Sequence, residues 1–155
     1  MLSVTIEQAG KDDAFRRLDA LASALRDLSD MWPDVRDEFF TIEQEMFDSE
    51  GASNASGGWE PLSPHYAAWK EANFGTPILQ RTGTLMASLT SDAADVVMTA
   101  DSLTVGTSIP YAGYHQDGTS RMPARPVIDL SPANQERLID RARQWVDSRV
   151  LEAAA

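Results

Sequence analysis

Apolar residues return every three or four positions in two stripes of the N-terminal third, and this spacing constrains the fold more than any other feature. The first stripe is Phe15, Leu18, Leu21, Ala22, Leu25 and Leu28, and the second is Trp32, Val35, Phe39, Ile42 and Met46. Such spacing puts the side chains on one face of an α-helix. Because Pro33 is tolerated in a first helical turn but breaks a helix interior, the sequence predicts a new helix or a kink there.

A further long helix is predicted near the C-terminus. Ser131 is a typical N-cap residue, and Pro132 suits the first helical position. The apolar positions that follow recur at helical steps. They predict a buried face made of Leu138, Ile139, Ala142, Trp145, Val146 and Val150.

Two segments alternate between apolar and polar residues, which is typical of strands. One is an N-terminal strand with Leu2, Val4 and Ile6 on its apolar face. The other is a hairpin with Ala100 and Asp101 at its polar tip, flanked by Val96 and Met98 before it and Leu103 and Val105 after it.

These elements predict an α+β fold in a single domain of 155 residues. We expect an acidic N-terminal strand and long helices over residues 1–48, a flexible loop over 49–58, a core with a hairpin over 59–130 and an amphipathic C-terminal helix over 131–150. The hairpin forms a small antiparallel β-sheet, and the C-terminal helix is expected to pack across it.

The loop SEGASNASGG at 49–58 supplies no apolar surface to offset the entropy of ordering it, so we expect it to be mobile. After it, Ser63 and Pro64 predict the start of a short helix that ends at Gly75. A second short helix is predicted with three inward side chains: Leu85, Met86 and Leu89.

The composition excludes several classes of protein. Cysteine is absent, which removes disulfides and thiolate chemistry. No run of eighteen apolar residues and no leader pattern is found, so we expect a soluble, intracellular chain. Residues 1–50 hold thirteen acids against five bases, which is −8 of the net charge of −11. Because nucleic acids are held chiefly through basic side chains, the chain is a poor candidate for gripping DNA. We expect most of these acids to occupy exposed helical positions.

The stretch YAGYHQDGTSRMPARPVIDLS at 111–131 contains the residue types of a hydrolase. His115, Asp117 and Ser120 lie too close in sequence to be assumed to form a catalytic triad, and no nucleophile elbow is present. Two histidines without cysteine give no metal-ligand pattern, and no phosphate-binding glycine loop occurs. The sequence therefore predicts no catalytic, cofactor or metal site.

Aromatic residues follow the loop at helix-like steps, namely Trp59, Tyr66, Trp69 and Phe74. Base stacking would require a positive groove, and only Lys70 is close in sequence. A small core and a subunit interface both remain open as explanations.

Several short motifs then occur in a fixed order. They are WEPLSP from Trp59, Tyr66 and Lys70, Ile78-Leu79, RTGTL from Arg81 with Ser88, VGT from Val105, Tyr111-Ala112, His115-Gln116 with Gly118, MPARP from Met122, and Leu130-Ser131. In this combination the chain resembles the virion morphogenesis and tail completion family of tailed phages, the small proteins of the head-to-tail neck. The resemblance covers residues 59 to about 146, and the N-terminal third is similar only in being helical.

The resemblance implies a structural protein without enzymatic activity or cofactor. Such a protein would form a ring, with a hexamer as the expected order, between portal-side connector proteins and the tail tube. Double-stranded DNA would pass through without specific binding, and the N-terminal acids would face the channel or its exit. The implied location is the head–tail junction of the virion, for a protein made in the bacterial host cytoplasm and not bound to membrane.

A closed ring needs two different complementary patches on each subunit. We expect one patch on residues 59–74 and the other on residues 111–126, where Gly118 permits a turn and prolines stiffen the segment. The expected interface residues are Trp59, Tyr66 and Trp69 on the first patch, and Tyr111, Tyr114, His115 and Arg125 on the second. In this arrangement His115 acts as a polar strut.

Three alternatives remain open at this stage. A tail terminator that caps the tail tube has the same size and location. A stand-alone acidic module that imitates DNA would be a monomer that binds basic enzymes. A hydrolase that uses His115 would lose activity when that residue is replaced by alanine.

Overall fold

The computed structural model describes residues 11–154, and its element order confirms the predicted α+β class. The elements are α1 (Lys11–Ala24), α2 (Trp32–Asp48), α3 (Pro64–Phe74), α4 (Thr84–Thr90), β1 (Asp95–Met98), β2 (Leu103–Gly106), α5 (Ala112–Asp117) and α6 (Pro132–Ala154). The expected strand at Leu2–Ile6 lies outside the described residues. Helix α5 falls in a stretch where we expected no long regular structure.

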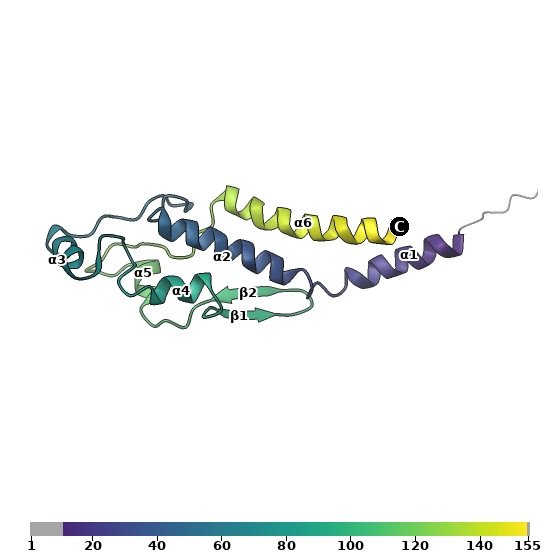
Figure 1. Cartoon of the computed structure of the whole chain (residues 1–155), viewed down its shortest axis with the longest axis horizontal. Helices are drawn as coiled ribbons and strands as arrows, with labels where there is room; N and C mark the ends of the chain where they lie inside the picture. Colours follow the sequence, from purple (N-terminus) through teal and green to yellow (C-terminus); the bar gives the residue numbers. More distant parts are fainter. Residues whose placement is uncertain (1–10, 155) are drawn as a thin grey trace, which may run out of the picture.

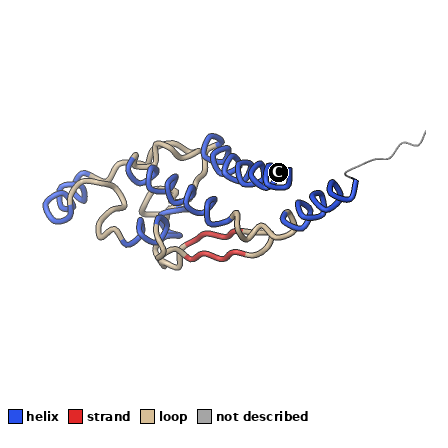
Figure 2. The backbone as a smooth tube through the Cα atoms, turned by 45° about the vertical axis from the view of Figure 1, so that its right-hand side comes forward, coloured by secondary structure: helices blue, strands red, loops and turns tan. Residues whose placement is uncertain are grey.

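Helix α2 lies at the centre of the arrangement (Figure 1). Helix α6 packs along one side of it, and α4 and the β-hairpin lie on the other side. Figure 2 shows the same order from a second angle, with α2 between α6 and the two strands. The expectation that α6 packs across the sheet is therefore wrong, because α2 has apolar side chains over a wide arc and separates the two.

The predicted hairpin is confirmed in its register. Val96 pairs with Val105 and Met98 pairs with Leu103 in an antiparallel arrangement. Its tip is held to the connection between α1 and α2. The backbone N–H of Leu28 donates to the carbonyl of Ala100 at 2.7 Å, and the indole Nε1 of Trp32 donates to the carbonyl of Thr99 at 2.7 Å.

The predicted helix boundaries are also confirmed. Pro33 lies in the first turn of α2, where its missing N–H has no helical partner to lose. The hydroxyl of Ser131 accepts a hydrogen bond from the backbone N–H of Asn134 at 3.3 Å, at the start of α6. Gly75 ends α3 with a φ of 90°. Ser63 precedes α3 but its side chain makes no capping hydrogen bond.

Two apolar clusters form the core. The larger joins the C-terminal half of α2 to α4 and to the segments around Trp59 and Val127. The smaller joins Met31 and Val35 to Trp145 of α6. Residues Arg137 and Arg141 of α6 also reach across to Glu38 of α2, at 2.8 Å and 3.0 Å.

The predicted buried face of α6 is partly wrong. Trp145 is buried, and Leu138, Ala142 and Val146 pack against the smaller cluster. Ile139 and Val150, however, are 45% and 44% exposed. The contact face includes Asn134, which is buried and donates to the carbonyl of Ser53. The buried face is thus narrower than the apolar pattern suggested, because α6 packs mainly against α1 and α2.

The apolar stripe of α1 is also more exposed than a core helix would allow. Phe15 is 58% exposed and Leu18 is 61% exposed. Helix α1 packs mainly against α6, and it continues beyond the body of the molecule in Figure 1. Part of the first predicted stripe is therefore exposed to solvent in the described structure.

The segment at 49–58, expected to be a mobile loop, is held by specific contacts. Asn54 is buried, and its side-chain amide donates to the carbonyl of Pro126 at 2.9 Å. The hydroxyl and N–H of Ser56 both donate to the carboxylate of Asp129. The expectation was based on the lack of apolar side chains, but here polar side chains and backbone groups supply the contacts.

Trp59 follows this segment and belongs to the core. Its ring packs edge-on against Phe47 at 5.5 Å between centroids, and its Nε1 donates to the carbonyl of Pro126 at 2.8 Å. Gly51 is required beside it, because a Cβ there would come within 2.6 Å of the Trp59 ring. With 6% exposure, Trp59 is a core residue of the described chain, and its expected part in a subunit interface stays a prediction.

Glu43 is a second departure from expectation. It lies among Phe39, Met46 and Phe47 on the buried face of α2 and is 1% exposed. Its Oε2 has no hydrogen-bond partner among the described residues. Burial raises the pKa of this carboxyl to about 8. The expectation of exposed carboxylates with unperturbed pKa values is therefore wrong at this position.

We predict that Trp59→Ala lowers the free energy of unfolding by roughly 3–5 kcal/mol, because it removes a buried ring and leaves a cavity. Trp69→Ala is the matched control, since Trp69 is 40% exposed, and it should cost less than about 1 kcal/mol. Urea unfolding followed by circular dichroism measures both. Equal losses in the two variants would contradict the assignment of Trp59 to the core.

We also predict that stability falls as pH rises from about 4.5 to about 8. The folded chain retains the Glu43 proton up to about pH 8, whereas the unfolded carboxyl releases it near its ordinary value of 4.5. Between these two pH values the folded state therefore binds more protons than the unfolded state. The stabilisation is complete below the lower pH value and is lost as pH rises to the upper one. The loss should be on the order of a few kcal/mol.

Glu43→Gln stays neutral and should remove this dependence. Urea unfolding at a series of pH values should give equal stabilities at the acidic end and a more stable variant above pH 8. The exposed Glu71→Gln serves as the control, with a profile like that of the unaltered chain. A Glu43→Gln profile as steep as the control would refute the prediction.

Candidate functional site

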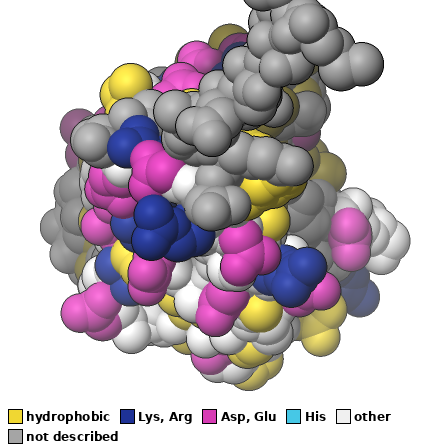
Figure 3. Space-filling model, turned by 90° about the vertical axis from the view of Figure 1, so that its right-hand side faces the viewer, with side chains coloured by type: hydrophobic (Ala, Val, Ile, Leu, Met, Phe, Trp, Pro, Cys, Tyr) yellow, Lys and Arg dark blue, Asp and Glu magenta, His cyan; other side chains and the backbone are white. Residues whose placement is uncertain are grey.

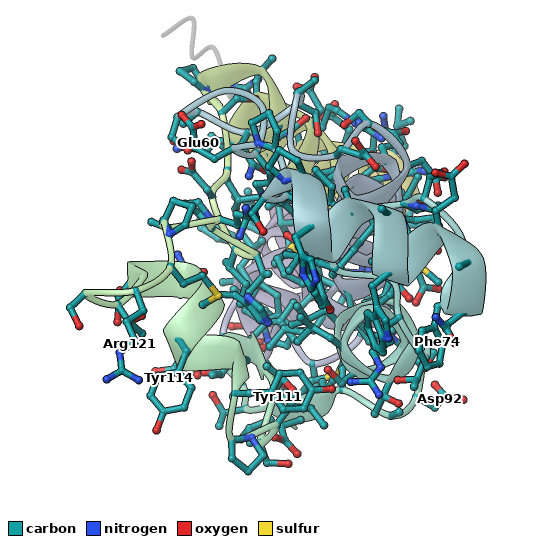
Figure 4. The ribbon with its side chains drawn as sticks, turned by 90° about the vertical axis from the view of Figure 1, so that its left-hand side faces the viewer. Glu60, Phe74, Asp92, Tyr111, Tyr114 and Arg121 are labelled. Atoms are coloured by element: carbon teal, nitrogen blue, oxygen red, sulfur yellow. The ribbon has the colours of Figure 1, made fainter. Side chains whose placement is uncertain are left out.

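A pocket of about 590 Å³ opens at one end of the molecule, bounded by α3, the start of α4, α5 and the segment 121–125. Figure 4 looks onto this end. Tyr111, Tyr114 and Arg121 lie on one side of the view and Phe74 lies on the other. The pocket therefore brings together parts of the chain that are far apart in sequence.

The pocket is mainly apolar where it meets the core. Leu85 is buried in the larger cluster, and Leu62 and Leu79 pack against it. The rings of Tyr66 and Tyr111 add aromatic surface, and both are about two-fifths exposed, at 39% and 42%. Such a surface suits a partner that combines apolar and polar groups.

The charge of the pocket is its most distinctive property. Between positions 37 and 136 the chain has four basic residues, and all four line this pocket: Lys70, Arg81, Arg121 and Arg125. No aspartate or glutamate is among the described residues that line it. A chain with a net charge of −11 thus gathers its central positive charge at one place.

Two of these cations are buried and bind backbone carbonyls. Lys70 is 2% exposed, and its Nζ donates to the carbonyls of Gly75 and Pro77 at 3.0 Å and 2.6 Å. It closes the turn after α3, where a cation is favoured by the helix dipole. Its charge has no carboxylate partner in the part of the chain that the structure describes.

Arg125 is the second buried cation, at 4% exposure. Its Nε donates to the carbonyl of Glu60 at 2.6 Å and its Nη2 to the carbonyl of Pro61 at 2.8 Å. Burial lowers the pKa of the guanidinium, and the nearby charge of Glu60 partly opposes this. The guanidinium of Arg125 therefore links its own segment to the distant segment at Glu60 and Pro61. Because Arg125 is buried, it forms part of the floor of the pocket.

Arg81 and Arg121 are exposed at the edge of the pocket. The guanidinium of Arg81 lies over the rings of Phe74 and Trp69, at 4.7 Å and 5.4 Å from their centroids. Arg121 is labelled in Figure 4 at the outer edge of this end. Neither guanidinium forms an ion pair with a carboxylate of the described residues.

His115 lines the same pocket, and its Nδ1 is buried without a hydrogen-bond partner in the described structure. Its ring lies edge-on to Tyr111 at 6.0 Å between centroids. Burial, together with the charge of Arg125, lowers the pKa of the imidazole. The expected polar strut is thus provided by its backbone, whose carbonyl accepts from the N–H of Arg125 at 2.7 Å.

The described residues show no catalytic arrangement around His115. No hydrogen bond among residues 11–154 joins His115 to Asp117 or Ser120. No group of three or more histidine, cysteine, aspartate or glutamate side chains in this range is placed to hold a metal ion. None of the helices in this range is long and apolar enough to span a membrane.

The two expected interface patches prove to be one surface. Tyr66 from the first patch and Tyr111, His115 and Arg125 from the second line the same pocket. Trp69 stacks on Tyr66 at 5.5 Å, and Tyr114 is 62% exposed nearby. The segments 59–74 and 111–126 therefore lie at the same end of the described structure, and their use as two complementary patches stays a prediction.

Sequence reasoning missed the three other cations of the pocket. From the sequence, Lys70 is expected to be an isolated base, and Arg81 and Arg121 are assigned no interface role. The signal that could have found them is their distribution, since no other base lies between positions 37 and 136 apart from Arg125.

The wall formed by residues 116–128 is held by side-chain and backbone hydrogen bonds. The side-chain oxygen of Gln116 accepts from the N–H groups of Val127 and Ile128, and its amide donates to the carbonyl of Ile128. Gly118 ends α5 with a φ of 72°. A Cβ there would lie 2.7 Å from the backbone N of Ala124. This stretch is thus architecture that shapes the pocket.

Comparison with known proteins agrees with this description. The profile of the phage virion morphogenesis family matches residues 11–147, and the chain belongs to that family. It is 28% identical over 115 residues to a protein of Escherichia phage Mu named "Putative capsid assembly protein G", covering 68% of this chain and 70% of that protein. No solved structure matches the chain. Its role is therefore in the structure or assembly of a phage particle.

We predict that Gly118→Ala destabilises the chain by more than about 1 kcal/mol, because the left-handed φ and the contact with Ala124 both oppose a side chain. Gly113→Ala is the matched control. It lies within α5, nothing lies within 4 Å of its added Cβ, and it should stabilise by up to roughly 1 kcal/mol. Thermal unfolding of both variants measures the difference. A stable Gly118→Ala chain would show that this turn does not fix the wall.

Proposed function

We propose that the chain is a structural component of the head-to-tail neck, present as a ring of copies around the DNA channel. The observation that carries this proposal is the family match over residues 11–147, together with the ordered motifs from Trp59 to Ser131. The ring is expected to be a hexamer that contacts neighbouring neck and tail tube proteins. A tail terminator is the nearest variant of the same proposal.

A non-catalytic role is supported by what the polar groups of the pocket do. Lys70 and Arg125 use their donors on backbone carbonyls, and both are buried. The ring of His115 makes no hydrogen bond to Asp117 or Ser120 in the described structure. These groups stabilise the shape of a surface, which is what a repeated subunit requires.

The charge of α2 suits a surface that DNA passes. Asp34, Asp37 and Asp48 are exposed and lie on one face of the helix, at spacings of three and eleven residues. Carboxylates repel phosphates over a Debye length of about 8–10 Å at physiological salt. Glu38 is drawn into ion pairs with α6 and Glu43 is buried, so neither belongs to this face. Asp37 remains exposed, but it pairs with Arg36 of the same helix at 2.6 Å.

The test is the position of the chain in assembled particles. A chain with a C-terminal tag should restore particles that lack the corresponding gene product. Electron microscopy of these particles should then show label at the capsid-to-tail junction, with density of ring form. Label only at the distal tail, or absence from finished particles, would overturn the neck proposal. Label at the upper end of the tail tube alone would favour the terminator variant.

A second measurement tests the acidic face. Reversal of Asp34 and Asp37 to lysine should slow DNA ejection from such particles, because the lumen would then attract phosphates. The control reverses Glu136 and Asp140, which are exposed carboxylates on α6. Equal ejection rates in the two sets of particles would show that the acidic face does not line the channel.

A further inference from the structure

The pocket at the α3–α5 end holds positive charge that no carboxylate among the described residues balances. Lys70 and Arg125 are buried and donate to backbone carbonyls, whereas Arg81 and Arg121 are exposed and have no carboxylate partner among the described residues. No acidic residue of the described chain lines the pocket. Elsewhere, Arg137, Arg141 and Arg143 all have carboxylate partners within 3.0 Å. The pocket is therefore complementary to a carboxylate-bearing segment that also offers apolar surface.

The chain has such a segment at the connection between α1 and α2. Leu25 is 42% exposed and Asp27 is exposed. The side chain of Asp30 is 81% exposed and forms a long ion pair, at 3.6 Å, with Arg149 of α6. The hydroxyl and N–H of Ser29 donate to the Asp27 carboxylate and lower its pKa, which favours the charged form. The connection is a short turn between the two helices, and Asp27 and Asp30 are exposed on it.

The turn cannot reach the pocket of its own copy. It precedes α2, while the pocket lies beyond the other end of that helix (Figure 1). Seventeen residues make α2 about 25 Å long at 1.5 Å per residue. The turn is also pinned to the hairpin tip through Leu28 and Trp32. The turn can therefore enter only the pocket of another molecule.

The end opposite the pocket carries both required properties. Figure 3 shows this end, where acidic and basic side chains lie beside hydrophobic patches. We propose that the pocket lined by Lys70, Arg81, Arg121 and Arg125 receives the Leu25–Asp30 turn of a second copy of this chain. Contact is then head-to-tail and uses two different surfaces, which produces closed rings or open filaments. This inference deepens the proposed ring and rests on it for its biological setting.

Disulfide trapping tests the contact directly, because the chain has no cysteine of its own. The double variant Asp30→Cys with Arg121→Cys places one thiol on each surface. Mild oxidation should give a ladder of covalent dimers, trimers and larger species on a non-reducing gel. The matched control is Arg143→Cys with Arg121→Cys, which uses an exposed residue of α6 whose side chain is 59% exposed, and it should give no ladder.

Charge reversal provides the second test, by sedimentation velocity over a concentration series. Arg121→Asp and Asp30→Arg should each weaken association by about tenfold or more, and the two changes in one chain should restore it. An equimolar mixture of the two single variants should also associate beyond pairs, because the intact turn of one variant fits the intact pocket of the other and the two reversed charges face each other in the next contact. Arg26→Glu removes the one base in the turn and should strengthen association. Raising salt from ~0.1 M to ~1 M shortens the Debye length from about 10 Å to about 3 Å and should weaken it.

The outcomes separate this inference from the neck proposal. A chain that stays monomeric to its solubility limit and gives no ladder overturns the pocket contact. Association that is unchanged by both Arg121→Asp and Asp30→Arg also overturns it. If Arg121→Asp removes the chain from particles without changing self-association, the pocket binds a different protein and the inference is wrong while the neck stands. If the ladder forms but the chain is absent from the junction, the neck proposal falls and the contact stands.

Discussion

The burial of α2 on two sides holds the rest of the structure in place. Its apolar arc runs from Val35 to Phe47 and is covered by α6 on one side and by α4 and the hairpin on the other. Because this arc is wide enough to serve both neighbours, the sheet and the C-terminal helix never need to meet. The same arc encloses Glu43, whose burial costs stability as soon as the carboxyl loses its proton.

The end of α2 also determines where the pocket forms. The chain leaves α2 through the 49–58 segment, and Asn54 and Trp59 both bind the carbonyl of Pro126. This brings residues 54–61 against 125–130, and Arg125 then reaches the carbonyls of Glu60 and Pro61. A loop without apolar side chains is thus ordered by polar contacts that the sequence pattern does not reveal.

The family assignment and the pocket lead to one physical description. The chain belongs to the phage virion morphogenesis family, and it presents a cationic, aromatic pocket although its net charge is −11. An acidic subunit repels both DNA and its own copies except where positive charge is gathered. Charge separation between the two ends therefore suits both a channel that releases DNA and a directional contact between copies.

The sequence by itself determined the local elements. Pro33, Ser131 and the alternation around Ala100-Asp101 specify helix starts and a hairpin through short-range sterics and hydrogen bonding, so these predictions were confirmed. Only the tertiary structure decided which faces are covered, because exposure depends on which element packs against each face. Trp59 lies in the core, Ile139 is exposed, and the two predicted patches line one pocket. The sequence did not predict these outcomes, because contacts between distant segments leave no periodic signal in the chain.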